Sequence, residues 1–365
     1  MPKTKTIHIT YIGRLEKEKG IEIVIDAIKR GINEKRNIIW HVCWDGSYLK
    51  KIQEINNENI QIYWRISHEK ISSILAQTDF VIMPSLFLET FGLVALETLS
   101  QGVPVVWFSQ GGLIDFIHPT LVLDSKNPVD SLFRIIDNWV FPLVDISDLS
   151  FDNWMSKLTE LTLWMDKILL VNDYTKLVGW AEQYIHNLAA SLKSLWKTVE
   201  IFGYSGDTSR LMRIWIMMVT PIAFWRGIVL TKKIHHFNPD LIWMHSILRY
   251  IGPYWVRIIW DTDCKKYITH HDLGLITPRP SQVYSEWDIP NTPHLGDWIP
   301  KKISIYSIIE TLLKWSYVRL LWYTLSKNTI QHILPSPWMR PYYQKYSNTS
   351  PIIFPHSISP NQSNK

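Results

Sequence analysis

Short apolar runs alternate with amphipathic stretches along most of the chain, a pattern typical of parallel α/β domains. The runs contain few polar residues, as strands buried on both faces do. The stretches between them repeat apolar residues at helical spacing. In the first part of the chain we expect strands at 7–13, 37–43, 60–66, 80–84, 103–108 and 121–124, a loop and helix within 14–31 that Gly31 closes, and helices at 47–55, 68–77, 91–101 and from Pro128.

A polar, helical stretch at 145–162 precedes a second series of the same kind. The pattern therefore predicts two Rossmann-like, doubly wound α/β domains, at 1–163 and 164–365. In the second domain we expect strands at 165–173, 198–206, 240–245, 256–261, 267–272, 330–336 and 351–358, and helices at 178–195, 208–236 and 301–326.

Residues 84–106, PSLFLETFGLVALETLSQGVPVV, place Glu89 and Glu97 in an otherwise almost wholly apolar segment. A helix that begins at Phe91 and Gly92 directs free N–H groups and its positive dipole end at the loop carrying Glu89. That helix start suits a diphosphate, while the two carboxylates suit hydroxyl groups. The ligand that fits both is a sugar nucleotide. The alternative is a buried strand-helix unit whose glutamates are surface or capping residues.

Two cations lie in the first connection, Arg14 at the strand end and Lys19 before Gly20. Open α/β sheets bind ligands beyond the carboxyl ends of their strands, where such cations can clamp a diphosphate. The alternative is that both are solvated loop charges.

Composition narrows the class of protein further. The 365 residues suffice for two domains, and the N-terminus MPKTKTIHIT lacks a signal-peptide core, so we expect a cytoplasmic protein. Cys43 and Cys264 lack metal-like spacing, which argues against a zinc site or a disulfide framework. The net charge of +5 suits acidic ligands or anionic lipid headgroups, but there is no concentrated Lys/Arg stripe, so no nucleic-acid partner is expected.

The central stretch resembles the Glu-x7-Glu signature of retaining glycosyltransferase family 4, and YIGRLEKEKGIEIVIDAI resembles its Gly-Arg-Leu-x3-Lys-Gly motif. This resemblance implies the GT-B fold, in which two Rossmann-like domains face a cleft, with the donor bound by the domain at 1–163. The donor-binding residues that it implies are Gly13, Arg14, Lys19, Glu89, Thr90, Phe91, Gly92, Leu93 and Glu97.

The second half resembles the acceptor-binding domain of the same family, with Gly179, His245, His271 and Asp272 on the acceptor side. His270 is a competing register for His271. In the family this domain comes first, so the resemblance implies a circular permutation; the rival account is a fusion of fragments from two transferases. Cuts in exposed linkers remove few contacts, so such a permutation is physically tolerable.

The implied reaction transfers a sugar from a nucleotide diphosphate sugar, as co-substrate, to a hydroxyl of a glycan, lipid-linked or small-molecule acceptor, with retained configuration. Arg14, Lys19, Glu89 and His271 are the implied catalytic residues, with no metal and no other cofactor. The resemblance also implies peripheral contact with the inner face of the membrane, through 214–233 and 304–325. The alternative is that both segments are core helices. Asp261-x-Asp263 is expected to be a polar turn rather than a metal site. The alternatives are a nucleotide-sugar epimerase of the same fold and a non-catalytic nucleotide-binding partner subunit.

Tryptophan is unusually frequent, with 19 Trp against 15 Gly, whereas glycine alone should reach about 7%. Trp44, Trp64, Trp107 and Trp180 stand where strand ends, tight turns and the family pattern favour glycine. Our hypothesis is that the source organism reads UGA as glycine. The alternative is a genuinely Trp-rich enzyme.

Overall fold

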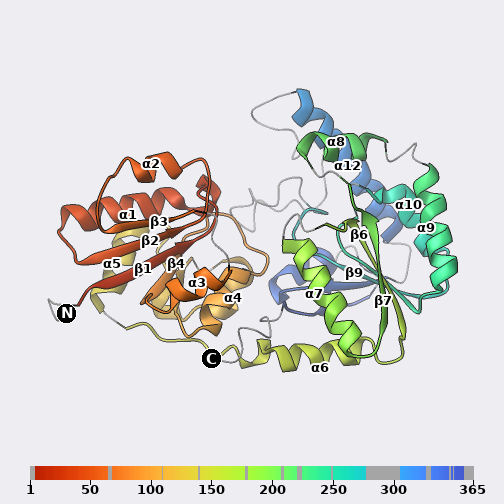
Figure 1. The fold of residues 1–365 in the computed structure, drawn as a ribbon, viewed down its shortest axis with the longest axis horizontal. Coiled ribbons are helices and arrows are strands. Elements are labelled where there is room, and N and C mark those ends of the chain that lie inside the picture. The colour runs from red at the N-terminus through yellow and green to blue at the C-terminus, as the bar shows by residue number, and fades with distance from the viewer. Residues whose placement is uncertain are drawn as a thin grey trace. The chain divides into compact units, whose positions relative to one another are not determined.

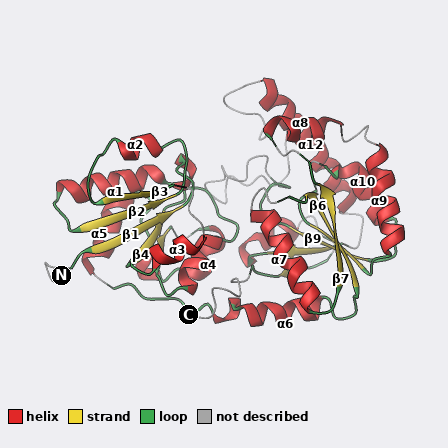
Figure 2. Ribbon diagram, in the orientation of Figure 1, coloured by secondary structure: helices red, strands yellow, loops and turns green. Residues whose placement is uncertain are grey.

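The chain forms two compact units in a computed structural model, each with its own parallel sheet and each described by itself (Figures 1 and 2). Within the described residues, the first unit comprises all residues up to Asn153 together with His356, and the second comprises those from Trp154 to Pro355. The structure describes residues 5–64, 68–108, 110–138, 140–176, 180–206, 209–219, 224–247, 250–276, 305–325, 330–344, 347 and 349–356.

The first unit is a five-stranded sheet with the order β3-β2-β1-β4-β5, in which every strand pair is parallel. Helices lie on both faces, with α1 and α5 packed against each other on one of them. The expected doubly wound α/β architecture of this half is confirmed. Its elements are β1 (Ile7–Ile12), η1 (Lys17–Lys19), α1 (Ile21–Asn33), β2 (Ile38–Cys43), α2 (Leu49–Gln53), β3 (Ile60–Tyr63), α3 (His68–Leu75), β4 (Phe80–Met83), α4 (Leu93–Ser100), β5 (Val105–Trp107), η2 (Gly111–Phe116), η3 (Pro119–Leu121), α5 (Pro128–Asn138) and η4 (Ser147–Leu149).

Apolar periodicity explains most of these elements, and three details differ from expectation. Gly31 does not close the first helix: it is buried inside α1, which continues to Asn33. The helix after β4 begins at Leu93 rather than at Phe91, because Gly92 is its left-handed N-cap residue with φ 78°. The segment 121–124 is not a strand; Val122 makes only an isolated bridge to Trp107.

The second unit contains a six-stranded parallel sheet with the order β11-β10-β9-β8-β6-β7. The expected parallel α/β architecture is therefore confirmed for this half as well. Its elements are α6 (Phe151–Leu161), which begins at the boundary, β6 (Lys167–Tyr174), α7 (Trp180–Ser194), β7 (Thr198–Tyr204), α8 (Arg210–Val219), α9 (Phe224–Phe237), β8 (Leu241–Met244), α10 (Gly252–Trp260), β9 (Lys265–Thr269), α12 (Ile305–Leu325), β10 (Gln331–Leu334), η8 (Pro337–Met339), α13 (Arg340–Gln344) and β11 (Ile352–Ile353).

One predicted strand of this unit is wrong: the apolar run 256–261 belongs to α10 and the turn after it. A short apolar run cannot by itself distinguish a buried strand from a buried helix. Asp261 and Asp263 lie in that turn, as expected. The sequence placed α6 with the first domain, whereas the structure packs it within the second unit: Trp154 stacks on Phe354 with ring centroids 5.2 Å apart, and the Tyr267 hydroxyl donates to Leu161 O at 3.1 Å.

Candidate functional site

The strand order of the first unit brings the loops after β1 and β4 together. These strands pair directly, although four helical elements and two strands separate them along the chain. The chain crosses from β3 at one edge to β4 on the other side of β1, which makes the carboxyl ends of β1 and β4 a topological switch point. Ligands of open α/β sheets bind at such points.

The two loops are joined through their backbones, and Gly20 makes this approach feasible. Gly20 has φ 73°, and a Cβ atom at this position would lie 1.7 Å from Pro84 O. The Leu86 N–H donates to Glu18 O at 3.0 Å. Only glycine combines this left-handed conformation with so close a backbone contact.

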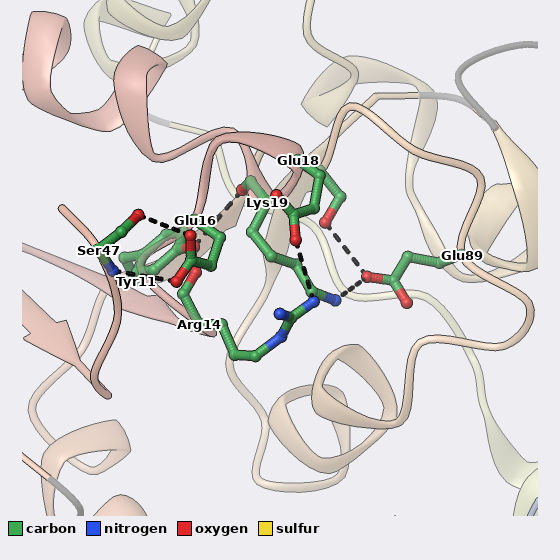
Figure 3. A network of polar contacts seen from close by, with 8 residues as sticks. Tyr11, Arg14, Glu16, Glu18, Lys19, Ser47 and Glu89 are labelled. Carbon is green, nitrogen blue, oxygen red and sulfur yellow. Dashed lines mark hydrogen bonds and ion pairs between the residues drawn. The ribbon is translucent and has the colours of Figure 1, made fainter. Parts of the chain in front are cut away.

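An ion pair between Lys19 and Glu89 spans the switch point, as Figure 3 shows. The Ser85 hydroxyl donates to the same carboxylate oxygen of Glu89 at 3.2 Å. The Lys19 ammonium also lies 4.5 Å from the centre of the Phe87 ring. The side chains of Lys19 and Glu89 are only 22% and 15% exposed, so this pair is screened less than a surface ion pair.

Arg14 lies in the same loop, half exposed, with its guanidinium 3.2 Å from Glu18 (Figure 3). The Tyr11 hydroxyl, at the end of β1, donates to Arg14 O at 2.8 Å and lies 3.5 Å from Lys19 O. Burial raises the pKa of Tyr11 far above its ordinary value, although Arg14 opposes the rise, so the hydroxyl remains a donor. Tyr11 thus holds the loop of both cations, together with Gly13, whose N–H donates to Cys43 O at 3.3 Å.

The start of α4 follows Glu89 directly. The N–H groups of Ala95 and Leu96 both donate to Gly92 O, so the N–H groups of Leu93 and Val94 precede the first intrahelical bonds. The structure therefore has the expected helix start after the Glu89 loop. Before it, Phe91 is buried and its ring meets that of His356 edge to face, 5.0 Å between centroids. A Cβ atom on Gly112 would lie only 2.1 Å from Thr90 O.

Glu97 is half-buried within α4. Burial raises the pKa of its carboxyl to about 7, so it is close to half-protonated at neutral pH. Among the described residues, no cation pairs with it. A carboxyl with a pKa shifted this far is a candidate for a ligand-binding role.

Sequence reasoning missed the loop after β5, which holds the Glu89 segment in place. The Gln110 side-chain amide donates to Ser85 O at 3.1 Å, and the Gly112 N–H donates to Glu89 O at 2.7 Å. Gly111 has φ 67°, and a Cβ there would lie 2.6 Å from Glu89 O. The adjacent glycines after an apolar run were the available signal, because they mark a close backbone approach.

In the second unit, His245 and His271 follow neighbouring strands, β8 and β9. His245 Nδ1 lies 3.1 Å from His271 Nε2, and the rings stack with centroids 5.3 Å apart. The Tyr184 ring of α7 meets His271 edge to face at 5.0 Å. Burial lowers the pKa of His271 to about 4, so its imidazole is neutral at physiological pH.

The remaining acceptor-side residues have different surroundings. His270 is fully buried, with Nε2 2.9 Å from His332 Nδ1 and its ring 4.0 Å from that of Tyr343. Asp272 is exposed and accepts the Gly274 N–H at 2.6 Å, which closes a turn. Gly179 lies outside the described residues.

Comparison with known proteins finds similarities that lie in the first unit. Residues 2–139 match the family described as glycosyl transferases group 1. Two uncharacterized glycosyltransferases of Methanocaldococcus jannaschii are 28% identical over 134 residues and 30% over 145 residues, which is 35% and 36% of this chain and 36% of each relative. A glycogen synthase of Mycobacterium tuberculosis is 29% identical over 117 residues, 31% of this chain and 28% of that protein.

The similarity to glycosyl transferases group 1 thus lies within the first unit, and the chain spans between 28% and 36% of the length of these curated relatives. Among solved structures, the catalytic domain of the cholesterol-α-glucosyltransferase of Helicobacter pylori aligns with 37% of this chain and 86% of its own, with 18% identity and a TM-score of 0.32. The Anabaena protein HepE in complex with UDP-glucose aligns with 37% of this chain and 39% of its own, with 20% identity and a TM-score of 0.32.

The described residues offer neither a metal cluster nor a membrane span. No group of three or more His, Cys, Asp or Glu side chains there is arranged to hold a metal ion. None of the helices in that part of the chain combines the length and apolarity needed to cross a bilayer.

Proposed function

We propose that the protein is a retaining glycosyltransferase that moves a sugar from a nucleotide diphosphate sugar to an acceptor hydroxyl. The observation that carries this proposal is the Lys19–Glu89 ion pair at the switch point of a group 1 glycosyltransferase domain. It joins a cation suited to a diphosphate with a carboxylate suited to sugar hydroxyls. The start of α4 lies directly after Glu89 and adds N–H donors.

In this proposal Arg14, Lys19 and the N–H groups at the start of α4 stabilise the charge that develops on the departing diphosphate. Such preorganised donors supply a large part of the rate enhancement in many enzymes. Glu89 orients the sugar by accepting from its hydroxyls, and Glu97 does the same for the ribose. The reaction requires no metal ion, because the cations and the helix dipole supply the positive charge.

The second unit is the acceptor domain in this proposal. His271 contributes a neutral imidazole that hydrogen-bonds a sugar hydroxyl, and the depressed pKa of His271 supports that protonation state. His245 holds the ring of His271 through the 3.1 Å contact. Gly179 and Asp272 complete the acceptor side.

The proposed domain order is donor-binding (1–163) and then acceptor-binding (164–365), a circular permutation of the family order. The group 1 match at 2–139, in the first unit, supports it, as does the separate parallel sheet of the second. A gene encoding 164–365 ahead of 1–163 should give a transferase of similar activity. A rearranged protein that folds and binds donor but transfers no sugar would contradict the permutation.

A lipid-linked acceptor and peripheral contact with an anionic membrane are also part of the proposal. The exposed face of α9 runs from apolar Trp225, Ile228 and Val229 to Lys232, and the sequence of α8 and α9 contains no acidic residue. An apolar stripe followed by cations is typical of helices that lie in the bilayer interface. Replacing Ile228 and Val229 together by Asp should abolish co-sedimentation with phosphatidylglycerol vesicles. The control is Leu163→Asp, which changes an exposed apolar residue elsewhere in the unit.

The transferase proposal is tested by removing the Lys19 ammonium. Lys19→Ala should lower kcat/KM for the donor by about 10²-fold to 10³-fold, the usual effect of losing one charge-stabilising donor. The control is Lys29→Ala, which removes an exposed cation from α1. Both variants are checked for folding by circular dichroism. Unchanged turnover in folded Lys19→Ala would refute the diphosphate clamp.

The alternatives make different predictions in the same assays. Nucleotide sugars are first screened for thermal stabilisation of the purified protein. A nucleotide sugar that stabilises the protein and is consumed without any acceptor would indicate an epimerase. A stabilising sugar that is never consumed, even with acceptors present, would indicate a non-catalytic partner protein.

A further inference from the structure

Two tryptophans have backbone conformations that residues with a side chain rarely adopt. Trp44 has φ 117° and Trp196 has φ 63°. The other non-glycine residues with positive φ in the described part of the chain, Lys35, Asn56 and Asn238, have φ between 45° and 51°, at the edge of the left-handed helical region. A bulky residue with positive φ is a genuine outlier, and 117° lies well beyond the left-handed helical range.

Trp196 occupies the position where a helix C-terminus favours glycine. Its N–H donates to Lys193 O at 3.0 Å, and the N–H of Lys197 donates to Leu192 O at 3.1 Å. These two bonds define a Schellman motif after α7, with Trp196 as the left-handed residue, which is usually glycine. Trp196 as a whole residue is 94% exposed, so its packing offers almost nothing to offset the strain.

Trp107 shows a different sign of misfit. The residue is 0% exposed at the end of β5, and its indole N–H has no hydrogen-bond partner within the described residues. Buried indole N–H groups normally find an acceptor, because burying an unsatisfied donor is costly. This third position was also a predicted glycine site.

Trp44 begins a loop that supports the candidate donor site. After it, Asp45 O accepts the Leu15 N–H at 3.0 Å, and the Ser47 N–H and hydroxyl donate to Glu16 at 3.0 and 2.6 Å. Leu15 and Glu16 directly follow Arg14, and Figure 3 shows the Ser47–Glu16 contact beside it. Position 44 therefore lies directly before the residues that hold the segment following Arg14.

We infer that the protein made in its source organism carries glycine at positions 44, 107 and 196, encoded by UGA, and that the glycine at 44 positions the Arg14 loop. Two of these positions come from the sequence, and 196 comes from the structure alone. Trp64, which is 61% exposed, and Trp180, whose side chain lies outside the described residues, belong to the same set by their sequence context. Reassigning these five positions would change 19 Trp and 15 Gly to 14 Trp and 20 Gly and so account for part of the tryptophan excess.

The source DNA gives the first test. Codons 44, 107 and 196 should be TGA, and codon 40 should be TGG, because Trp40 lies inside strand β2 and not at a strand end or turn that favours glycine. TGG at positions 44, 107 and 196 would overturn the inference.

Variants of the purified protein give a second, independent test. Trp196→Gly should raise the Tm by a few degrees relative to Trp196→Ala, since both remove the indole but only glycine relieves the left-handed strain. Equal Tm values would overturn the conformational argument. Trp196 lies outside the proposed donor site, so this measurement does not depend on the proposed function.

The positioning role at 44 rests on the proposed function and is tested with inorganic pyrophosphate. Trp44→Gly should bind pyrophosphate at least tenfold more tightly than Trp44→Ala. Trp196→Gly should have the same Kd for pyrophosphate as the unsubstituted protein. Equal affinity of the two position-44 variants would overturn the positioning role. If no variant binds pyrophosphate while the codons are TGA, the diphosphate site fails and the glycine assignment stands.

Discussion

The half-buried carboxyl of Glu97 makes the stability of the first unit depend on pH in a predictable direction. Burial raises its pKa to about 7 in the folded protein, against about 4.3 in an unfolded chain. Between these values the unfolded chain has lost a proton that the folded protein keeps, so stability falls as pH rises. Each pH unit of that window is worth about 1.4 kcal/mol, and the full effect well above pH 7 is about 4 kcal/mol.

Glu97→Gln removes this titration while it keeps the size of the side chain. The difference in unfolding free energy, variant minus wild type, should rise by about 3 kcal/mol from pH 4.5 to pH 7.5 and stay constant above pH 8. Urea unfolding at half-unit pH steps measures it. The control is Glu58→Gln, which makes the same chemical change at an exposed position of the same unit, and the rise for Glu97→Gln is measured relative to it. A flat or falling difference for Glu97→Gln would refute the reasoning.

Two further predictions concern backbone geometry. Gly20→Ala should lower the free energy of unfolding by more than about 2 kcal/mol, because the added Cβ would overlap Pro84 O. The control is Gly102→Ala, since Gly102 is also left-handed but has open space around it, and this variant should lose only about 1 kcal/mol. Equal losses in urea unfolding would contradict this prediction. Asp173→Ala should cost about 3 kcal/mol, because the buried carboxylate accepts the N–H groups of Tyr250 and Ile251 at 2.7 and 3.0 Å. Asp173→Asn keeps an acceptor oxygen and should lose less, and the reverse order in thermal unfolding would show that these bonds do not matter.

The hydrophobic pattern predicted most helices and strands correctly and failed where an apolar run fits either a strand or a buried helix. The apolar stripe of α1 repeats at the helical period, so only a helix buries it. The run 256–261 is apolar enough for a strand or a buried helix, and packing in the second unit made it α10. The start of α4 moved from Phe91 to Leu93 because Gly92 adopts a left-handed conformation, which no hydrophobic pattern encodes.

The sequence by itself determined two parallel α/β halves, because apolar periodicity is a property of a linear chain. From motif spacing it also predicted Arg14, Lys19, Glu89 and Glu97 as candidate ligand-binding residues. Only the tertiary structure decided that Lys19 pairs with Glu89, since their contact bridges 70 residues and depends on β1 and β4 being neighbours. Burial alone decided that Glu97 has a raised pKa, because desolvation depends on atoms from several segments. The positive φ angles at Trp44 and Trp196 were likewise decided by the structure, since a backbone dihedral is set by the contacts on both sides of the residue.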